Sequence, residues 1–131
     1  MKVYIDTCVF IDYFLIRKDI IRPLNDFANL AFEKIKKNNY ELIISDLILT
    51  ELKKTFNHSD EIKEFFKDFK IIKVTTDNKD KIKAKQYKTH YSDALHFVLA
   101  KKAKADILIT RNINDFLEFS KDLYIKLPEN F

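Results

Sequence analysis

The feature that most constrains the fold of this chain is a regular alternation of short apolar runs with segments of helical periodicity. The apolar runs are too short for helices and predict buried strands at residues 2–6, 41–45, 70–74, 106–110 and 122–127. Between them, apolar residues recur at helical spacing, which predicts helices at residues 7–17, 23–37, 45–56, 59–69, 76–87, 91–103 and 112–120. Strands that alternate with helices form a parallel sheet covered on both faces. The expected fold is a three-layer α/β/α sandwich with a central parallel sheet of about four to five strands.

The size and composition of the chain predict one domain. Its 131 residues suit a single core, and no repeat or linker divides them, so we expect one domain over residues 1–131. No apolar run approaches the roughly 20 residues of a membrane helix, and the first residues lack the pattern of a signal peptide. The single cysteine, Cys8, cannot form an internal disulfide, which is typical of a reducing compartment. We therefore expect a cytoplasmic protein with no membrane partner.

Glycine is absent from the chain, and this excludes several kinds of nucleotide-binding protein. Without glycine, no phosphate-binding loop of the Walker or Rossmann type is possible. The net charge of +4 favours a nucleic-acid partner but does not identify one.

Four acidic residues lie near the carboxyl ends of the expected strands, where sites form in sheets of this kind. Asp6 ends the first strand, and Glu51 lies in the helix after the second. Asp93 lies in the first turn of the helix at 91–103, and Asp115 follows the end of the fourth strand by five residues. Carboxylates that share a pocket raise one another's pKa, and a bound cation removes that cost. Because hard oxygen ligands select Mg²⁺ or Mn²⁺ over Zn²⁺, these residues predict a Mg²⁺ or Mn²⁺ pocket.

Each of these acids also has a simpler explanation. Asp6 could cap the helix that follows it, and Asp93 could be stabilised by the dipole of its own helix. Glu51 and Asp115 could be solvated surface residues. The metal-pocket hypothesis therefore depends on the whole set and its order along the chain. Three further acids are expected to be helix caps or surface residues: Asp12, Asp46 and Asp106.

Basic residues, histidines and the cysteine are further candidates for a functional role. Several basic residues on the same segments are candidate RNA contacts, and each could instead be a solvated surface cation: Lys53, Lys54, Lys101, Lys102 and Arg111. The spacing of His58, His90 and His96 does not match a zinc site, and we expect His96 to pack on or beside its helix. No base lies near Cys8 in the sequence, so a buried thiol is expected there rather than a nucleophile.

Two other classes of protein also place an aspartate after the first strand. A phosphatase of the haloacid dehalogenase type needs a second aspartate two residues later, where this chain has Cys8. A phospho-acceptor receiver domain needs an acidic pair near the first strand, and Asp6 has no acidic neighbour. The sequence fits both classes poorly.

Three segments resemble the successive motifs of PIN-domain ribonucleases, and in particular the small toxins of VapC type from prokaryotic toxin–antitoxin systems. They read VYIDTCVFIDYF (3–14), SDLILTELKK (45–54) and HYSDALHFVLAKKAKADILITRNINDF (90–116). The resemblance spans nearly the whole chain. It implies a PIN fold whose acidic pocket binds Mg²⁺ or Mn²⁺ and hydrolyses phosphodiester bonds in RNA. It also implies a cognate antitoxin partner and a homodimer.

The resemblance assigns catalytic and metal-binding roles position by position. Asp6, Glu51 and Asp93 match the first three acids of the family. The fourth is either Asp115, which we favour, or the position of Asn112, which we keep as a supporting residue.

The remaining matches concern supporting residues and departures from the family pattern. Thr7 and Thr110 match polar residues that hydrogen-bond the acids or a metal-bound water. Cys8 stands where serine or asparagine is common, and the turn before ADILIT must use Ala103 or Lys104 in place of glycine.

The alternative function is a catalytically silent PIN-like module that binds RNA or serves as a scaffold.

Overall fold

The computed structural model describes residues 1–16 and 22–131. Its five strands form one parallel sheet in the order β3-β2-β1-β4-β5. The strands are β1 (Lys2–Ile5), β2 (Glu41–Ser45), β3 (Lys70–Val74), β4 (Ile107–Ile109) and β5 (Tyr124–Lys126). The helices are α1 (Thr7–Phe14), α2 (Leu24–Lys37), α3 (Asp46–Thr55), α4 (Ser59–Phe66), α5 (Asn78–Ala84) and α6 (Tyr91–Lys102), with 3₁₀ helices η1 (Ile113–Phe119) and η2 (Pro128–Asn130).

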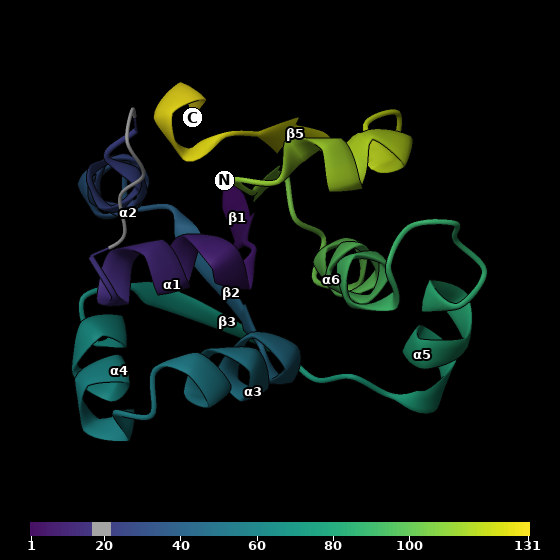
Figure 1. The fold of residues 1–131 in the computed structure, drawn as a ribbon, viewed down its shortest axis with the longest axis horizontal. Coiled ribbons are helices and arrows are strands. Elements are labelled where there is room, and N and C mark those ends of the chain that lie inside the picture. Colours follow the sequence, from purple (N-terminus) through teal and green to yellow (C-terminus); the bar gives the residue numbers. More distant parts are fainter. Residues whose placement is uncertain (17–21) are drawn as a thin grey trace.

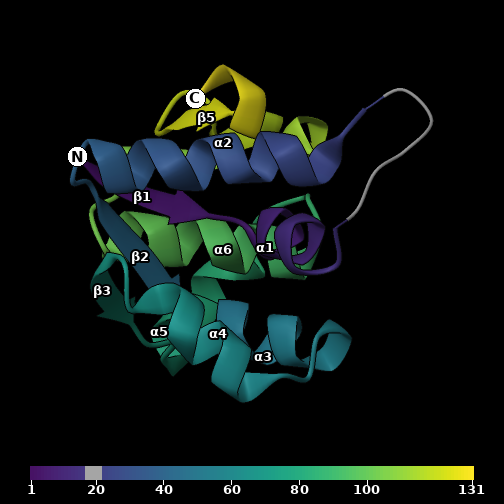
Figure 2. The same ribbon diagram turned by 90° about the vertical axis from the view of Figure 1, so that its left-hand side faces the viewer.

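The helices cover the two faces of the sheet. Helices α1, α2 and α4 lie on one side of the strands, and α5 and α6 lie on the other (Figure 1). Turned by 90°, the molecule shows α1, α2 and α4 in front of the sheet (Figure 2). The expected three-layer α/β/α sandwich is therefore confirmed, with five strands. Among the helices in the described ranges, none combines the length and apolar character that crossing a bilayer requires.

Three strands are shorter than expected: β5, expected at 122–127, spans Tyr124–Lys126, and the changes in β1 and β4 affect the candidate site. β1 ends at Ile5 and β4 at Ile109, so Asp6 and Thr110 lie just beyond the paired strands. The helix expected at 7–17 ends at Phe14. Arg17, where it was expected to end, lies outside the described residues. The helix expected at 112–120 is a 3₁₀ helix, the tighter form common in short connections.

Buried aromatic residues pack the helices of each layer against one another. On one face, the ring centroids of Phe10 in α1 and Phe32 in α2 are 5.1 Å apart. On the other face, Phe97 of α6 stacks on Phe119 of η1 with centroids 4.1 Å apart. This second pair fixes η1, and with it the segment that carries Asp115, beside α6.

Two turns show how the chain folds without glycine. Asn39 lies just after the end of α2 with φ of 60°, a left-handed conformation that asparagine tolerates better than most residues. Lys104 adopts φ of 58° in the turn between α6 and β4. The expectation that Ala103 or Lys104 forms this turn is confirmed.

Candidate functional site

A cavity of about 430 Å³ opens at the carboxyl edge of the sheet, next to the central strand. Three of the four predicted acids line it: Asp6, Glu51 and Asp93. The other residues that line it are Thr7, Cys8, Ile11, Lys54, Thr55, Ser92, His96, Arg111 and Asn112. The acids come from the end of β1 and the helices α3 and α6, which the parallel strand order brings to one edge.

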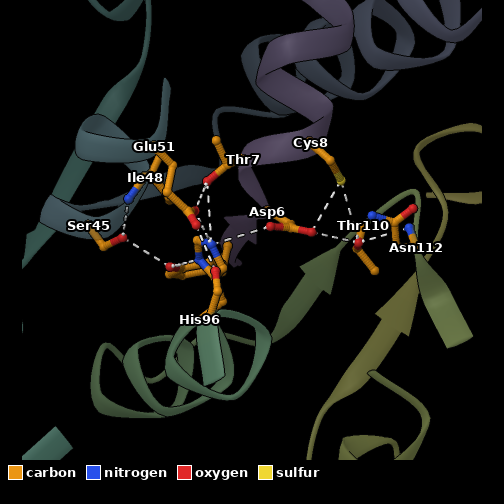
Figure 3. A network of polar contacts seen from close by, with 11 residues as sticks. Asp6, Thr7, Cys8, Ser45, Ile48, Glu51, His96, Thr110 and Asn112 are labelled. Atoms are coloured by element: carbon orange, nitrogen blue, oxygen red, sulfur yellow. Dashed lines mark hydrogen bonds and ion pairs between the residues drawn. The ribbon is translucent and has the colours of Figure 1, made fainter. Parts of the chain in front are cut away.

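Asp6 is a buried carboxylate held from the β4 side. Its exposed fraction is 5%, and its Oδ2 accepts hydrogen bonds from Thr110 Oγ1 at 2.9 Å and Cys8 Sγ at 3.2 Å (Figure 3). The backbone N–H of Asn112 in turn donates to Thr110 Oγ1 at 3.1 Å. The Asp6 side chain makes no capping bond to α1. Capping therefore does not explain this acid.

Glu51 is held by three donors from different parts of the chain. Its carboxylate accepts from Thr7 Oγ1 at 2.7 Å and Ser92 Oγ at 2.7 Å, and it contacts His96 Nε2 at 2.6 Å (Figure 3). Burial raises the pKa of Glu51, but the hydrogen bond and charge of His96 and the two hydroxyl donors lower it to about 2. Glu51 is therefore an ionised and oriented carboxylate, not a solvated surface residue.

His96 lies at the centre of this network, although the sequence predicted only that it packs on or beside its helix. It is 1% exposed, its Nδ1 lies 2.7 Å from Tyr4 Oη, and its Nε2 lies 3.4 Å from Asp6 Oδ1. Burial lowers the pKa of His96, but the Glu51 hydrogen bond and the charges of Asp6, Glu51 and Asp93 raise it overall. The raised pKa favours the histidinium, which donates to both Tyr4 and Glu51. The available signal was its position three residues after Asp93 on one helix, a spacing that places both near one face.

Asp93 is a half-buried carboxylate with an unusual pKa. Burial, followed by the charges of Asp6 and Asp115, raises the pKa of Asp93 to about 6.

The two candidates for the fourth position lie differently. Asp115 is exposed and does not line the cavity, whereas Asn112 does. Thr89 Oγ1 donates to the backbone carbonyl of Asp115 at 2.9 Å, which ties η1 to the start of α6. Of the two candidates for the fourth position, Asn112 therefore faces the cavity, and Asp115 acts on Asp93 through its charge.

The predicted basic residues do not all gather at this cavity. Lys54 and Arg111 line it. Lys53 is exposed on α3 and is not among the residues that line it. Lys101 donates to the backbone carbonyl of Asp122 at 3.2 Å and lines a separate cavity.

The length of α6 explains why its basic residues, Lys101 and Lys102, lie away from the acidic cavity. Asp93 is in the first turn of the helix and Lys101 in the last, which separates them by about 12 Å along the axis. Lys102, the next residue, donates to the backbone carbonyl of Thr75 at 2.7 Å and to Asp80 at 2.8 Å. The end of α6 therefore contacts the segment around α5, not the acidic cavity.

One expectation about the other acids was wrong. Asp12 is not on the surface: it is 2% exposed, and its Oδ2 accepts from Arg111 Nε at 2.7 Å. Its partner is 99 residues away in the sequence, so no local pattern indicated the pair. The other two acids are exposed as expected: Asp46 accepts from the backbone N–H and hydroxyl of Thr76, and Asp106 accepts from the N–H of Lys2.

The chemistry of the site fits a hard divalent cation. The side chains that share the cavity offer carboxylate oxygens. Burial and then the neighbouring negative charges raise the pKa of Asp93, and a bound cation relieves both costs. In the described ranges, however, no group of three or more histidine, cysteine or acidic side chains is already arranged as metal ligands. The Glu51 carboxylate is instead directed at His96, Thr7 and Ser92.

Replacing Asp93 with asparagine should stabilise the metal-free protein at neutral pH. The pKa of Asp93 is about 6 in the folded chain, against an ordinary value of 3.8, so the folded state binds more protons between these values. Stability therefore falls as pH rises through this window, and the neutral amide removes that loss. We expect a gain of about 1 kcal/mol at pH 7.5, below the full value of the shift because the group is half-buried, and little change at pH 4.

Urea unfolding in EDTA at pH 4, 5, 6 and 7.5 measures this difference. Asp106→Asn is the matched control, since Asp106 is exposed at the opposite edge of the sheet. A stability difference between wild type and Asp93→Asn that stays constant across this range contradicts the prediction.

The fold and the cavity together define a class of protein: a parallel α/β domain with a cluster of carboxylates at the carboxyl edge of its sheet. Residues 2–114 match the sequence model of the PIN domain. The chain therefore belongs to the PIN-domain family. Among curated proteins, no sequence matches it.

Solved structures with the same fold cover almost the whole chain. A domain of a functionally unknown protein from Methanocaldococcus jannaschii is 20% identical with a TM-score of 0.62, over 96% of this chain and 89% of that one. FitAcB from Neisseria gonorrhoeae is 17% identical with a TM-score of 0.61, over 98% and 99%. VapBC2 from Rickettsia felis, bound to a DNA fragment from their promoter, is 18% identical with a TM-score of 0.64, over 95% and 97%. At these identities the likeness shows a shared fold.

Proposed function

We propose that this chain is an endoribonuclease that requires Mg²⁺ or Mn²⁺, and that it acts as the VapC-type toxin of a toxin–antitoxin pair. The observation that carries the proposal is the convergence of Asp6, Glu51 and Asp93 on one cavity at the carboxyl edge of the sheet. Membership of the PIN-domain family and the fold shared with FitAcB and VapBC2 support it.

Each residue around the cavity has a role in this proposal. Asp6, Glu51 and Asp93 would hold the cation, with Asn112 or Asp115 completing the site. Bound there, the cation would supply a water activated for attack on the phosphate and would neutralise the leaving oxygen.

The neighbouring side chains orient these acids and receive the substrate. Thr110 and Thr7 donate to Asp6 and Glu51 and so fix the directions of their carboxylates. Lys54 and Arg111 line the cavity as cations and would bind the phosphate groups of RNA.

Incubation of the purified protein with RNA tests the activity directly. We expect cleavage in Mg²⁺ or Mn²⁺ that leaves 5′-phosphate and 3′-hydroxyl ends, and none in EDTA. The absence of cleavage in both metals, over a panel that includes tRNA, rRNA and mRNA, contradicts the proposal.

One observation favours the alternative of a catalytically silent module that binds RNA. The Glu51 carboxylate is already engaged by His96 at 2.6 Å, and the described residues contain no preformed group of three metal ligands. A silent module would bind RNA without binding a divalent ion.

Calorimetry with Mn²⁺ separates the two functions. We expect wild type to bind Mn²⁺ and Asp93→Asn to bind it at least about tenfold more weakly, because one carboxylate ligand is lost. Asp106→Asn, which removes an exposed acid at the other edge of the sheet, should bind as wild type does. RNA binding by a wild-type protein that takes up no Mn²⁺ identifies the silent module instead.

The proposal includes an antitoxin partner, and a second cavity has the chemistry to bind one. This cavity of about 720 Å³ lies among residues of α1, α2 and α4 and the loops beside them. It is lined by Tyr13, Phe14, Ile16, Asn25, Asp26, Asn29, Glu61, Glu64, Phe65 and Asp68. Aromatic rings beside four carboxylates suit a partner segment that is both apolar and basic.

Inhibition of cleavage by the antitoxin tests this assignment. We expect the antitoxin to inhibit the wild-type protein and to lose this inhibition when Glu64 and Asp68 are both replaced by lysine. Unchanged inhibition of that variant opposes the assignment.

A homodimer, a cytoplasmic location and a single domain over residues 1–131 complete the proposal. Packing beyond residue 114, where the family match ends, supports the single domain. β5 pairs with β4, and the ring of Phe131 lies against Tyr40 with centroids 6.3 Å apart. Size-exclusion chromatography with light scattering measures the oligomeric state.

A further inference from the structure

Asp12 is a buried charge that the proposed mechanism does not use. It lies in α1 with 2% of its surface exposed, one and a half turns after Asp6. Moving a carboxylate out of water is costly, and a buried ion pair is often no more stable than an apolar pair of the same size. Stability alone is therefore a weak reason for this residue, and the position of its partner suggests another.

That partner is Arg111, which lines the acidic cavity. Arg111 Nε donates to Asp12 Oδ2 at 2.7 Å, and Arg111 Nη1 lies 3.3 Å from Asn112 Oδ1. Asp12 therefore holds the guanidinium at Nε, and Nη2 donates no hydrogen bond to another side chain or backbone group within the described residues. The preceding residue, Thr110, donates to Asp6, so the backbone beside Arg111 is tied to the acidic cluster.

From this geometry we infer that Asp12 is a positioning residue for Arg111, and that the oriented guanidinium binds the phosphodiester group of the substrate. The inference rests on the proposed function, because the phosphodiester is the substrate of that reaction. A planar guanidinium fixed at one corner presents its remaining N–H groups in a set direction, which suits the oxygens of a phosphate. Asp12 also balances the charge of Arg111 in the absence of RNA. In this role it touches no substrate and acts through Arg111.

A double-mutant cycle on cleavage of a single-stranded RNA oligonucleotide tests this role. Arg111→Ala should lower kcat/KM by about tenfold to a hundredfold, mainly through KM, because it removes a charged phosphate contact. Asp12→Asn should lower kcat/KM by about tenfold in the wild-type background. In the Arg111→Ala background it should change kcat/KM by less than about twofold, because the residue it orients is gone. An equal loss in both backgrounds overturns the inference, since a purely structural role does not depend on Arg111.

Arg111→Lys keeps the inference testable if Asp12→Asn does not fold. Lysine retains the positive charge but has a single nitrogen, which cannot bind Asp12 and a phosphate in the fixed arrangement of the guanidinium. We expect the KM of Arg111→Lys to rise as much as that of Arg111→Ala. A wild-type KM in Arg111→Lys overturns the inference.

Binding of the same oligonucleotide in EDTA, followed by fluorescence anisotropy, separates this inference from the proposed function. If wild type cleaves no RNA, the proposed function fails, and the binding measurement still decides the role of Asp12. Weaker binding by Asp12→Asn that disappears in the Arg111→Ala background supports the inference. Equal binding by wild type and Asp12→Asn overturns it.

Discussion

Asp6→Asn is expected to reduce divalent-dependent RNA cleavage by about a thousandfold or more while preserving the fold. The asparagine keeps the shape of Asp6 but removes the charge that would hold the cation in the proposed mechanism. Its Oδ1 can still accept from Thr110, which donates to Asp6 at 2.9 Å. The loss should therefore appear in activity, and circular dichroism and the unfolding temperature should change little. Cleavage of an end-labelled RNA in Mg²⁺ and Mn²⁺, followed over time, measures the effect.

The matched control for this experiment is Asp106→Asn. Asp106 precedes β4 at the amino edge of the same sheet, and its carboxylate accepts from the N–H of Lys2 at 2.7 Å. It has the same charge as Asp6 but lies at the far end of the strands, so its removal should leave cleavage at the wild-type rate. Turnover by Asp6→Asn at the wild-type rate would sink the proposed assignment of the site.

His96→Ala is expected to lower the free energy of unfolding by about 3–5 kcal/mol. Two physical effects add in this variant. The substitution leaves a cavity where a fully buried ring stood, and it leaves Glu51 and Asp6 without the ring nitrogen that faces them at 2.6 and 3.4 Å. Tyr4 Oη also loses one of its two partners, at 2.7 Å, and keeps Ser45 Oγ at 3.0 Å. Urea denaturation at pH 7 measures the loss, and cleavage should also fall because Glu51 is no longer held in place.

His58→Ala serves as the control for His96→Ala. Its side chain is 61% exposed and lies 3.9 Å from Glu61, so the change in stability should stay within about 0.5 kcal/mol. A loss of less than about 1 kcal/mol for His96→Ala would show that the buried network contributes little to folding.

The positions of the principal acids could be predicted because each follows from local sequence. A strand that ends in Asp6, and a helix that carries Asp93 in its first turn, are visible in the chain itself. The alternation of strands and helices then places both at one edge of a parallel sheet. The resemblance to the family, and not this pattern, predicted that Ala103 or Lys104 forms the turn before β4, where Lys104 has φ of 58°.

Thr7 and Thr110 were predicted to support the acids, and they donate to Glu51 and Asp6. The other supporting residues could not be predicted, because their contacts join distant segments. The histidine at position 96 reads locally as one more residue on a buried helix, yet its partners come from β1 and α3. The pair of Asp12 and Arg111 spans 99 residues. Lys101 was misleading for the opposite reason, because its nearness to Asp93 in sequence becomes a separation of two helical turns in space.

The central position of β1 makes the acidic cavity depend on two segments that lie far apart in the chain. One of the two neighbours of β1 is β4, and the bond between Lys2 and Asp106 spans 104 residues. Contacts of such separation form late in folding. Asp6 can therefore meet Thr110 only after both β1 and β4 have been synthesised and have paired. For a site proposed to attack RNA, this topology makes assembly of the cavity a late event in the folding of the domain.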